Sequence, residues 1–225
     1  TPVVQSKWFA TVVVESPDST VAEQLQQLAI VDSVKWIWKG NLRVPAEEKW
    51  EDRFVSEDEP LHNEYGYSYK QIKMLNGTKL HEAGFRGEGM RVAVIDAGFM
   101  NADRVSAFDS LRLLGTHNVV FPGKSVFVGD DHGTKVLSCL AADIPGVMVG
   151  TAPKASYLLL KSEDSDSEYP VEEDYWTAAV EYADSAGVDV ISSSLGYFAF
   201  DTDELSYDQD ALDGRTAMIS RAANL

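Results

Sequence analysis

The 225-residue chain contains very little cysteine. Its single cysteine, Cys139, excludes an internal disulfide bond and a metal cluster built from several cysteines. Basic side chains are also scarce, since 19 Lys and Arg stand against 36 Asp and Glu, for a net charge of −17. A field of this sign repels phosphate backbones and anionic lipid, so we expect no nucleic-acid or membrane partner. No apolar run approaches the roughly 18 residues of a membrane span.

The N-terminus lacks an initiator Met and the basic-then-apolar pattern of a signal peptide, so we expect the chain to be cut from a longer product. Apolar residues make up 44% of the chain and aromatic residues 10%, which is enough for a sizeable core and argues against disorder. The length suggests one large domain, or one domain with a smaller piece attached.

Residues 1–40 are predicted to form a small α+β unit. The segment from Trp8 to Glu15 is rich in β-branched and aromatic residues and predicts a strand. Apolar residues then recur at helical spacing from Val21 to Leu28, and residues 31–39 alternate as in a second strand. A strand–helix–strand unit of this size buries too little to stand alone, so it must dock on something or be incomplete. Residues 41–64, which are highly charged, are predicted to be a linker.

Residues 65–225 are predicted to form an α/β domain. Buried strands are expected at 91–96, 157–161 and 188–194, and helices at 68–81, 132–142, 175–186 and 213–225. Strands that alternate with helices predict a parallel sheet flanked by helices.

Asp96 closes the first of these buried strands. Ligands of open parallel sheets sit beyond the carboxyl ends of strands, so Asp96 is a candidate functional residue. A carboxylate is costly to bury without partners, and it is not there to fill the core. A turn or helix-capping role is the alternative that the sequence leaves open.

His132 begins a predicted helix and is followed by Gly133 and Thr134. A helix N-terminus disfavours an imidazolium, whereas a nearby carboxylate favours it. These two opposing effects can keep the pKa of a histidine close to neutral pH, where a general base works best. A surface capping histidine is the open alternative.

Four motifs carry a family resemblance. They are GEGMRVAVIDAGF at 87–99, DHGTKVLS at 131–138, GTAPKA at 150–155 and VISSSLG at 190–196. In this order they resemble the subtilisin-like serine proteases, whose triad runs Asp, His, Ser. The resemblance covers roughly residues 65–225. It implies a subtilisin-like parallel sheet that is incomplete on its C-terminal side, and residues 1–40 look like part of a prodomain.

The resemblance also implies roles for residues. Asp96 would be the triad acid, His132 the general base, and the backbone of Ser194, Leu195 and Gly196 would pair with an extended substrate. The implied activity is that of a serine endopeptidase acting on peptides or proteins, secreted or in the cell envelope. We expect no cofactor and assign no metal ligand. The Asp-rich run at 201–213 could bind calcium, but a solvated loop is the preferred interpretation.

The sequence departs from the family in one serious respect. Neither a Gly-Thr-Ser motif nor a Gly-x-Ser-x-Gly motif is present, and the family's oxyanion-hole Asn would follow only after the position of Leu225. We therefore expect two triad members without the third, and no activity of the chain alone. The missing C-terminal half could be supplied by a second chain or a swapped dimer. The alternative is a catalytically dead peptide-binding module of the same fold.

Overall fold

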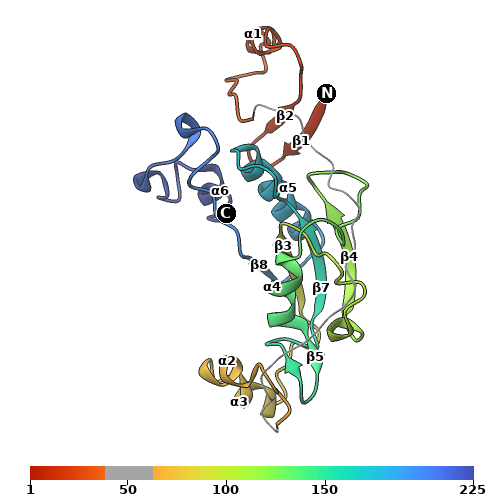
Figure 1. Ribbon diagram of the computed structural model, residues 1–225. Coiled ribbons are helices and arrows are strands. Elements are labelled where there is room, and N and C mark those ends of the chain that lie inside the picture. Colours follow the sequence, from red (N-terminus) through yellow and green to blue (C-terminus); the bar gives the residue numbers. More distant parts are fainter. Residues whose placement is uncertain (39–62) are drawn as a thin grey trace.

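A four-stranded parallel sheet forms the centre of the molecule (Figure 1). The computed structural model describes residues 1–38 and 63–225. The sheet has the order β4-β7-β3-β8, with β3 at Arg91–Asp96, β4 at Arg112–Asn118, β7 at Ser156–Lys161 and β8 at Val190–Ser193. All three pairings are parallel. The predicted α/β architecture is confirmed. The predicted linker lies, except for residues 63 and 64, outside the described residues.

The two faces of the sheet are buried by different helices. Successive side chains of a strand point to opposite faces. Ala93 and Ile95 of β3 accordingly pack with α5 (Val171–Ser185), whereas Val92 and Val94 pack with α4 (His132–Ala141). Because both faces are covered, β3 must be apolar at every position from 92 to 95, which is the continuous run that its sequence shows.

The remaining elements of the larger region are short. They are α2 (Tyr69–Met74), α3 (Gly77–Glu82), η1 (Ser106–Phe108), β5 (Asp143–Ile144), β6 (Met148–Val149), η2 (Asp203–Leu205), η3 (Gln209–Ala211) and α6 (Met218–Ala222). The single helix predicted over 68–81 is therefore wrong, because Asn76 takes a left-handed φ of 58° and separates α2 from α3. The helix predicted over 213–225 is confined to α6.

The N-terminal region is a hairpin followed by a helix. β1 (Pro2–Ser6) pairs antiparallel with β2 (Thr11–Val14), and α1 spans Val21–Gln26. The predicted strand at 8–15 is confirmed only from Thr11. The strand predicted at 31–39 is wrong over the described residues 31–38, which are irregular. The alternating pattern matches neither strand pairing nor burial, since the consecutive residues Ile37 and Trp38 pack against the α5 core and Trp36 is 60% exposed.

This hairpin docks on α5, as the small size of the unit requires. Its apolar side chains pack against the core beneath α5. The carboxylate of Glu181, on α5, accepts hydrogen bonds from the Ser6 hydroxyl and from the amides of Lys7 (2.9 Å) and Trp8 (3.2 Å). A carboxylate that accepts three donors from one turn fixes the hairpin in position on the helix.

We predict that Glu181→Gln loosens the hairpin. The amide nitrogen of glutamine cannot accept a hydrogen bond, so docking should weaken by about 1–2 kcal/mol. Limited proteolysis within residues 1–38 should then become roughly tenfold faster. Asp184→Asn, at an exposed position of the same helix, is the control and should cleave like the parent. Equal cleavage of all three proteins would contradict this role.

Candidate active site

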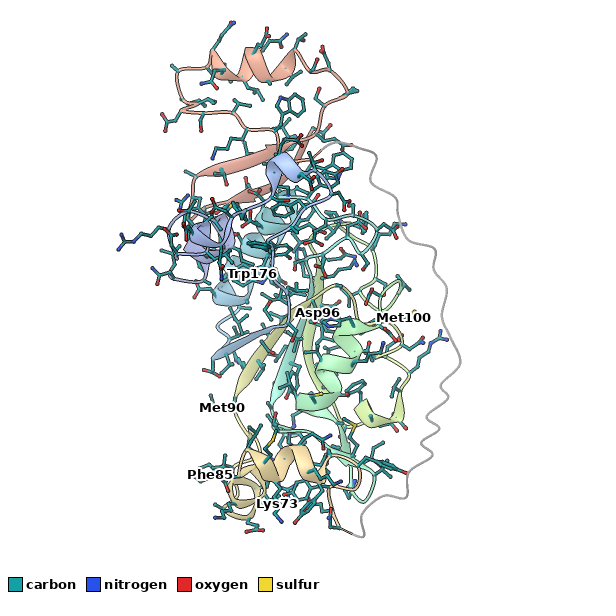
Figure 2. All side chains as sticks on the ribbon, turned by 60° about the vertical axis from the view of Figure 1, so that its left-hand side comes forward. Lys73, Phe85, Met90, Asp96, Met100 and Trp176 are labelled. Atoms are coloured by element: carbon teal, nitrogen blue, oxygen red, sulfur yellow. The ribbon has the colours of Figure 1, made fainter. Side chains whose placement is uncertain are left out.

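Asp96 and His132 form a hydrogen-bonded pair where β3 ends and α4 begins. Nδ1 of His132 lies 2.7 Å from Oδ1 of Asp96. Asp96 is fully buried, whereas the His132 side chain is 48% exposed. Figure 2 shows Asp96 in the middle of the molecule beside α4. The triad roles that the resemblance implies require these two side chains to meet, and the structure brings them within hydrogen-bonding distance.

Two glycines permit this close approach. A Cβ on Gly133 would lie 2.4 Å from the carbonyl oxygen of Gly98 and 2.9 Å from Cβ of Asp96. A Cβ on Gly98 would in turn lie 2.8 Å from the carbonyl oxygen of Asp130. Only glycine leaves room for such backbone contact. Thr134 links the first turn of α4 to the loop after β3, since its hydroxyl donates a hydrogen bond to the carbonyl of Met100 at 2.9 Å.

The electrostatics of the pair favour a protonated imidazole. The hydrogen bond to Asp96 raises the pKa of His132, and the charges of Asp96, Asp130 and Glu163 raise it further, against a smaller opposing effect of burial. Burial raises the pKa of Asp96, while the hydrogen bonds from His132 and the Ala97 amide lower it in part. With Nδ1 engaged by the carboxylate, Nε2 is the nitrogen available to take a proton from a reacting group.

The second oxygen of Asp96 is unsatisfied in the described part of the chain. Oδ1 accepts from both His132 and the Ala97 amide (2.8 Å), whereas Oδ2 is buried without a partner. Ala97 has no hydroxyl that could donate to it. The ammonium of Lys161, buried nearby at the end of β7, donates to the Ala97 carbonyl instead. Asp96 is therefore held through one oxygen, and burial dominates its pKa.

The segment predicted to bind substrate follows β8 directly. The last sheet pairing joins Ser193 to Ile95, and Ser194, Leu195 and Gly196 continue beyond it without regular structure. Ser194 and Gly196 are exposed and Leu195 is half-buried. Because β3 and β8 are parallel neighbours, this segment leaves the same edge of the sheet at which Asp96 lies. Its role in binding stays a prediction.

Sequence reasoning missed an acidic cluster next to the pair, which comprises Glu163, Glu168 and Glu172. One carboxylate oxygen of each lies within 4.8 Å of those of the other two. Burial raises the pKa of Glu163 to about 7, and the charges of Glu168 and Asp96 contribute to the rise. The run SEDSDSEYPVEE, directly after the buried strand β7, is the signal that could have drawn attention to this segment.

The Asp-rich run at 201–213 uses carboxylates for local structure. Asp208 caps η3 by accepting from the Ala211 amide, and Asp213 accepts from the amides of Arg215 and Thr216. Asp201 accepts from the Glu168 amide at 3.2 Å. The contacts of Asp208 and Asp213 are those of caps and turns, and they favour the solvated-loop interpretation.

Comparison with known proteins finds relatives among the subtilisins, although no family model matches the chain. Subtilisin E of Bacillus subtilis (strain 168) is 32% identical over 147 residues, which are 64% of this chain and 36% of the relative. The major intracellular serine protease of the same organism is 31% identical over 133 residues, 56% of this chain and 40% of the relative. The chain is similar in sequence to subtilisin-like serine proteases over this stretch.

The chain spans little more than a third of the length of these subtilisin-like relatives. Among solved structures, one similar to it is the serine protease MycP1, described as an essential component of the type VII (ESX-1) secretion system. It is 19% identical with a TM-score of 0.49, and the match covers 80% of this chain and 52% of MycP1.

We predict that Asp96→Asn lowers the pKa of His132 toward the ordinary value of imidazole. The substitution replaces the negatively charged carboxylate that favours the imidazolium by a neutral amide, whose single oxygen is a weaker acceptor. An NMR titration of the four histidines measures the change. Asp109→Asn, at an exposed position away from the pair, should leave the His132 titration as in the parent. A pKa of His132 unaffected by Asp96→Asn would contradict the contact.

A second prediction concerns the pH dependence of stability in the absence of divalent cations. Burial, as the main cause, raises the pKa of Glu172 from 4.5 to about 9. The folded state thus holds this proton more tightly than the unfolded state, and stability falls as pH rises above 4.5. Between pH 5 and pH 7 the free energy of unfolding of the parent, measured by urea denaturation, should fall by about 2 kcal/mol relative to that of Glu172→Gln. Parallel stability profiles would show that Glu172 does not titrate in this way.

Proposed function

We propose that this chain supplies the acid–base half of a subtilisin-type serine endopeptidase site, with Asp96 as the triad acid and His132 as the general base. The observation that carries the proposal is the 2.7 Å contact of Nδ1 with a buried carboxylate, on a histidine whose side chain is half exposed. The relationship to subtilisins over more than half of the chain supports the same reaction class.

The proposed reaction is acyl transfer. Nε2 of His132 takes the proton of a serine hydroxyl as that oxygen attacks the carbonyl carbon of the peptide bond. Asp96 holds the imidazole tautomer and stabilises the imidazolium, which then gives its proton to the leaving amine as the C–N bond breaks. Water hydrolyses the resulting ester by the same path. The 225 residues contain no Gly-Thr-Ser motif, so we propose that the serine and the oxyanion hole come from further polypeptide.

The edge strand β8 is the proposed place where that polypeptide packs. In the described part of the chain β8 pairs only with β3, and Val190 and Ile191 on it are 51% and 36% exposed. An apolar edge strand is a template for pairing with another segment. The partner would be a longer form of the same protein, a second chain or a swapped copy. Substrate would pair with Ser194, Leu195 and Gly196 at the end of the same strand.

The cellular location remains a prediction. Among the described residues, no helix is both long and apolar enough to cross a membrane. The family resemblance favours secretion or the cell envelope, but one relative is named as an intracellular protease.

The test of the proposed function is His132→Ala in the natural gene product that contains these 225 residues. Loss of the general base should reduce turnover of a chromogenic peptide by a factor on the order of 10⁶. His117→Ala is the matched control, because His117 stacks on Tyr182 at 4.6 Å and should leave turnover unchanged. The 225-residue chain alone should show no turnover.

Full activity of His132→Ala would contradict the assignment. A gene product that binds peptides tightly but is as inactive as His132→Ala would instead support a catalytically dead binding module.

A further inference from the structure

The acidic cluster of Glu163, Glu168 and Glu172 lies between the end of β7 and the first turn of α5. These carboxylates are not surface side chains in open solvent, because Glu172 is only 1% exposed and the other two are half-buried. One carboxylate oxygen of each residue lies within 4.8 Å of those of the other two. Like charges at such separations repel in a medium of low dielectric constant, so an arrangement of this kind calls for a compensating partner.

A comparison with the adjacent Glu173 shows that Glu172 lacks the partners of an ordinary structural carboxylate. Both oxygens of Glu173 are satisfied, since Oε2 accepts from the Tyr207 hydroxyl at 2.6 Å and Oε1 from the Ile219 amide at 2.9 Å. Oε1 of Glu172 accepts from the Asp164 amide at 2.9 Å. Oε2 of Glu172 is buried and has no hydrogen-bond partner among the described residues. A buried carboxylate oxygen without a donor is costly unless the group is protonated or contacts a cation.

Further unsatisfied oxygens lie in the same region. Of the five buried side-chain atoms without a hydrogen-bond partner in the described part of the chain, three belong to Ser162, Glu172 and Tyr197. Ser162 directly precedes Glu163. The charges of Glu163, Glu172 and Glu168 all act on the Tyr197 phenol and raise its pKa beyond the effect of burial. The hydroxyls of Ser162 and Tyr197 carry a hydrogen of their own, so Oε2 of Glu172 is the atom of these three that needs a donor or a cation from elsewhere.

The positive charge closest in sequence is already engaged. Lys161 ends β7 beside the cluster, and its ammonium donates to the Ala97 carbonyl. The charges of Asp164, Asp130, Glu163 and Glu172 all act on this one lysine. One ammonium held on a carbonyl cannot neutralise three carboxylates, so these carboxylates need either protons or a bound cation.

We propose that Glu163, Glu168 and Glu172 form a binding site for a divalent cation of the size of Ca²⁺. Calcium binds oxygen ligands at about 2.4 Å, so one ion can contact oxygens up to roughly 4.8 Å apart, which matches the cluster. Oε2 of Glu172 provides the buried ligand, and the half-buried Glu163 and Glu168 provide the side open to solvent. The bound ion would tie the segment 163–170 to the first turn of α5.

The experiment measures calcium binding to the 225-residue chain by calorimetry and by thermal unfolding. Saturating CaCl₂, added after treatment with EDTA, should raise the melting temperature by about 5 °C or more. Glu172→Gln keeps the acceptor for the Asp164 amide but removes the charge, and it should weaken calcium binding at least tenfold. Glu163→Gln and Glu168→Gln, at half-buried positions that tolerate substitution better, should do the same.

Asp210→Asn, in the exposed Asp-rich run, is the matched control and should bind calcium as the parent does. The proposal is overturned if the parent binds no calcium at millimolar concentration, or if the three glutamine variants retain its affinity. It is equally overturned if only Asp210→Asn loses binding, or if an arginine-containing peptide binds the cluster and calcium does not. None of these results depends on proteolytic activity, so they are distinct from the outcome of the His132→Ala test.

Discussion

The structure depends on the contact between the end of β3 and the start of α4. A buried carboxylate at the carboxyl end of a central strand needs a donor, and His132 supplies one at 2.7 Å. That contact requires the first turn of α4 to lie against the loop after β3, which Gly98 and Gly133 permit because neither carries a Cβ. The position of the histidine and its raised pKa both follow from this single approach.

Burial explains why the surroundings of the pair are electrostatically unusual. Asp96, Lys161, Glu163 and Glu172 lie near one another where β3 and β7 end, and all have pKa values shifted chiefly by burial. Such shifts are typical of functional sites, since ordinary cores avoid unpaired charge. The acidic segment after β7 and the Asp–His pair therefore belong to one electrostatic environment, in which the charge of Glu163 helps to raise the pKa of His132.

The sequence predicted those parts of the fold whose pattern has a single physical cause. The strand at 91–96 is apolar at every buried position before Asp96, and its bounds were predicted correctly. The pair of Asp96 and His132 followed from motif order. The strand at 31–39 was wrong because these residues dock on the core through the consecutive side chains of Ile37 and Trp38, an arrangement that an alternating pattern does not describe. The split of the helix at 68–81 depends on one left-handed Asn76, which propensity does not reveal.

The acidic cluster could not be assembled from sequence for a different reason. Glu163 and Glu172 are nine positions apart across an irregular segment, and only the packing of α5 on the sheet brings their carboxylates together. The strand predicted at 188–194 is shorter in the structure and ends at Ser193, so all of 194–196 follows it, and nothing in the sequence indicates how much of the backbone of this segment is exposed. Features that arise from tertiary packing become visible only in the folded chain.

The central claim is most directly tested by the tautomer of neutral His132, observed through ¹⁵N chemical shifts of the imidazole above its pKa. We predict that the proton resides on Nδ1, hydrogen-bonded to Asp96, and that Nε2 is unprotonated and free to act as a base. A neutral His132 with its proton on Nε2 would contradict the assignment, because the unprotonated nitrogen would then be Nδ1, which faces Asp96 and not a nucleophile.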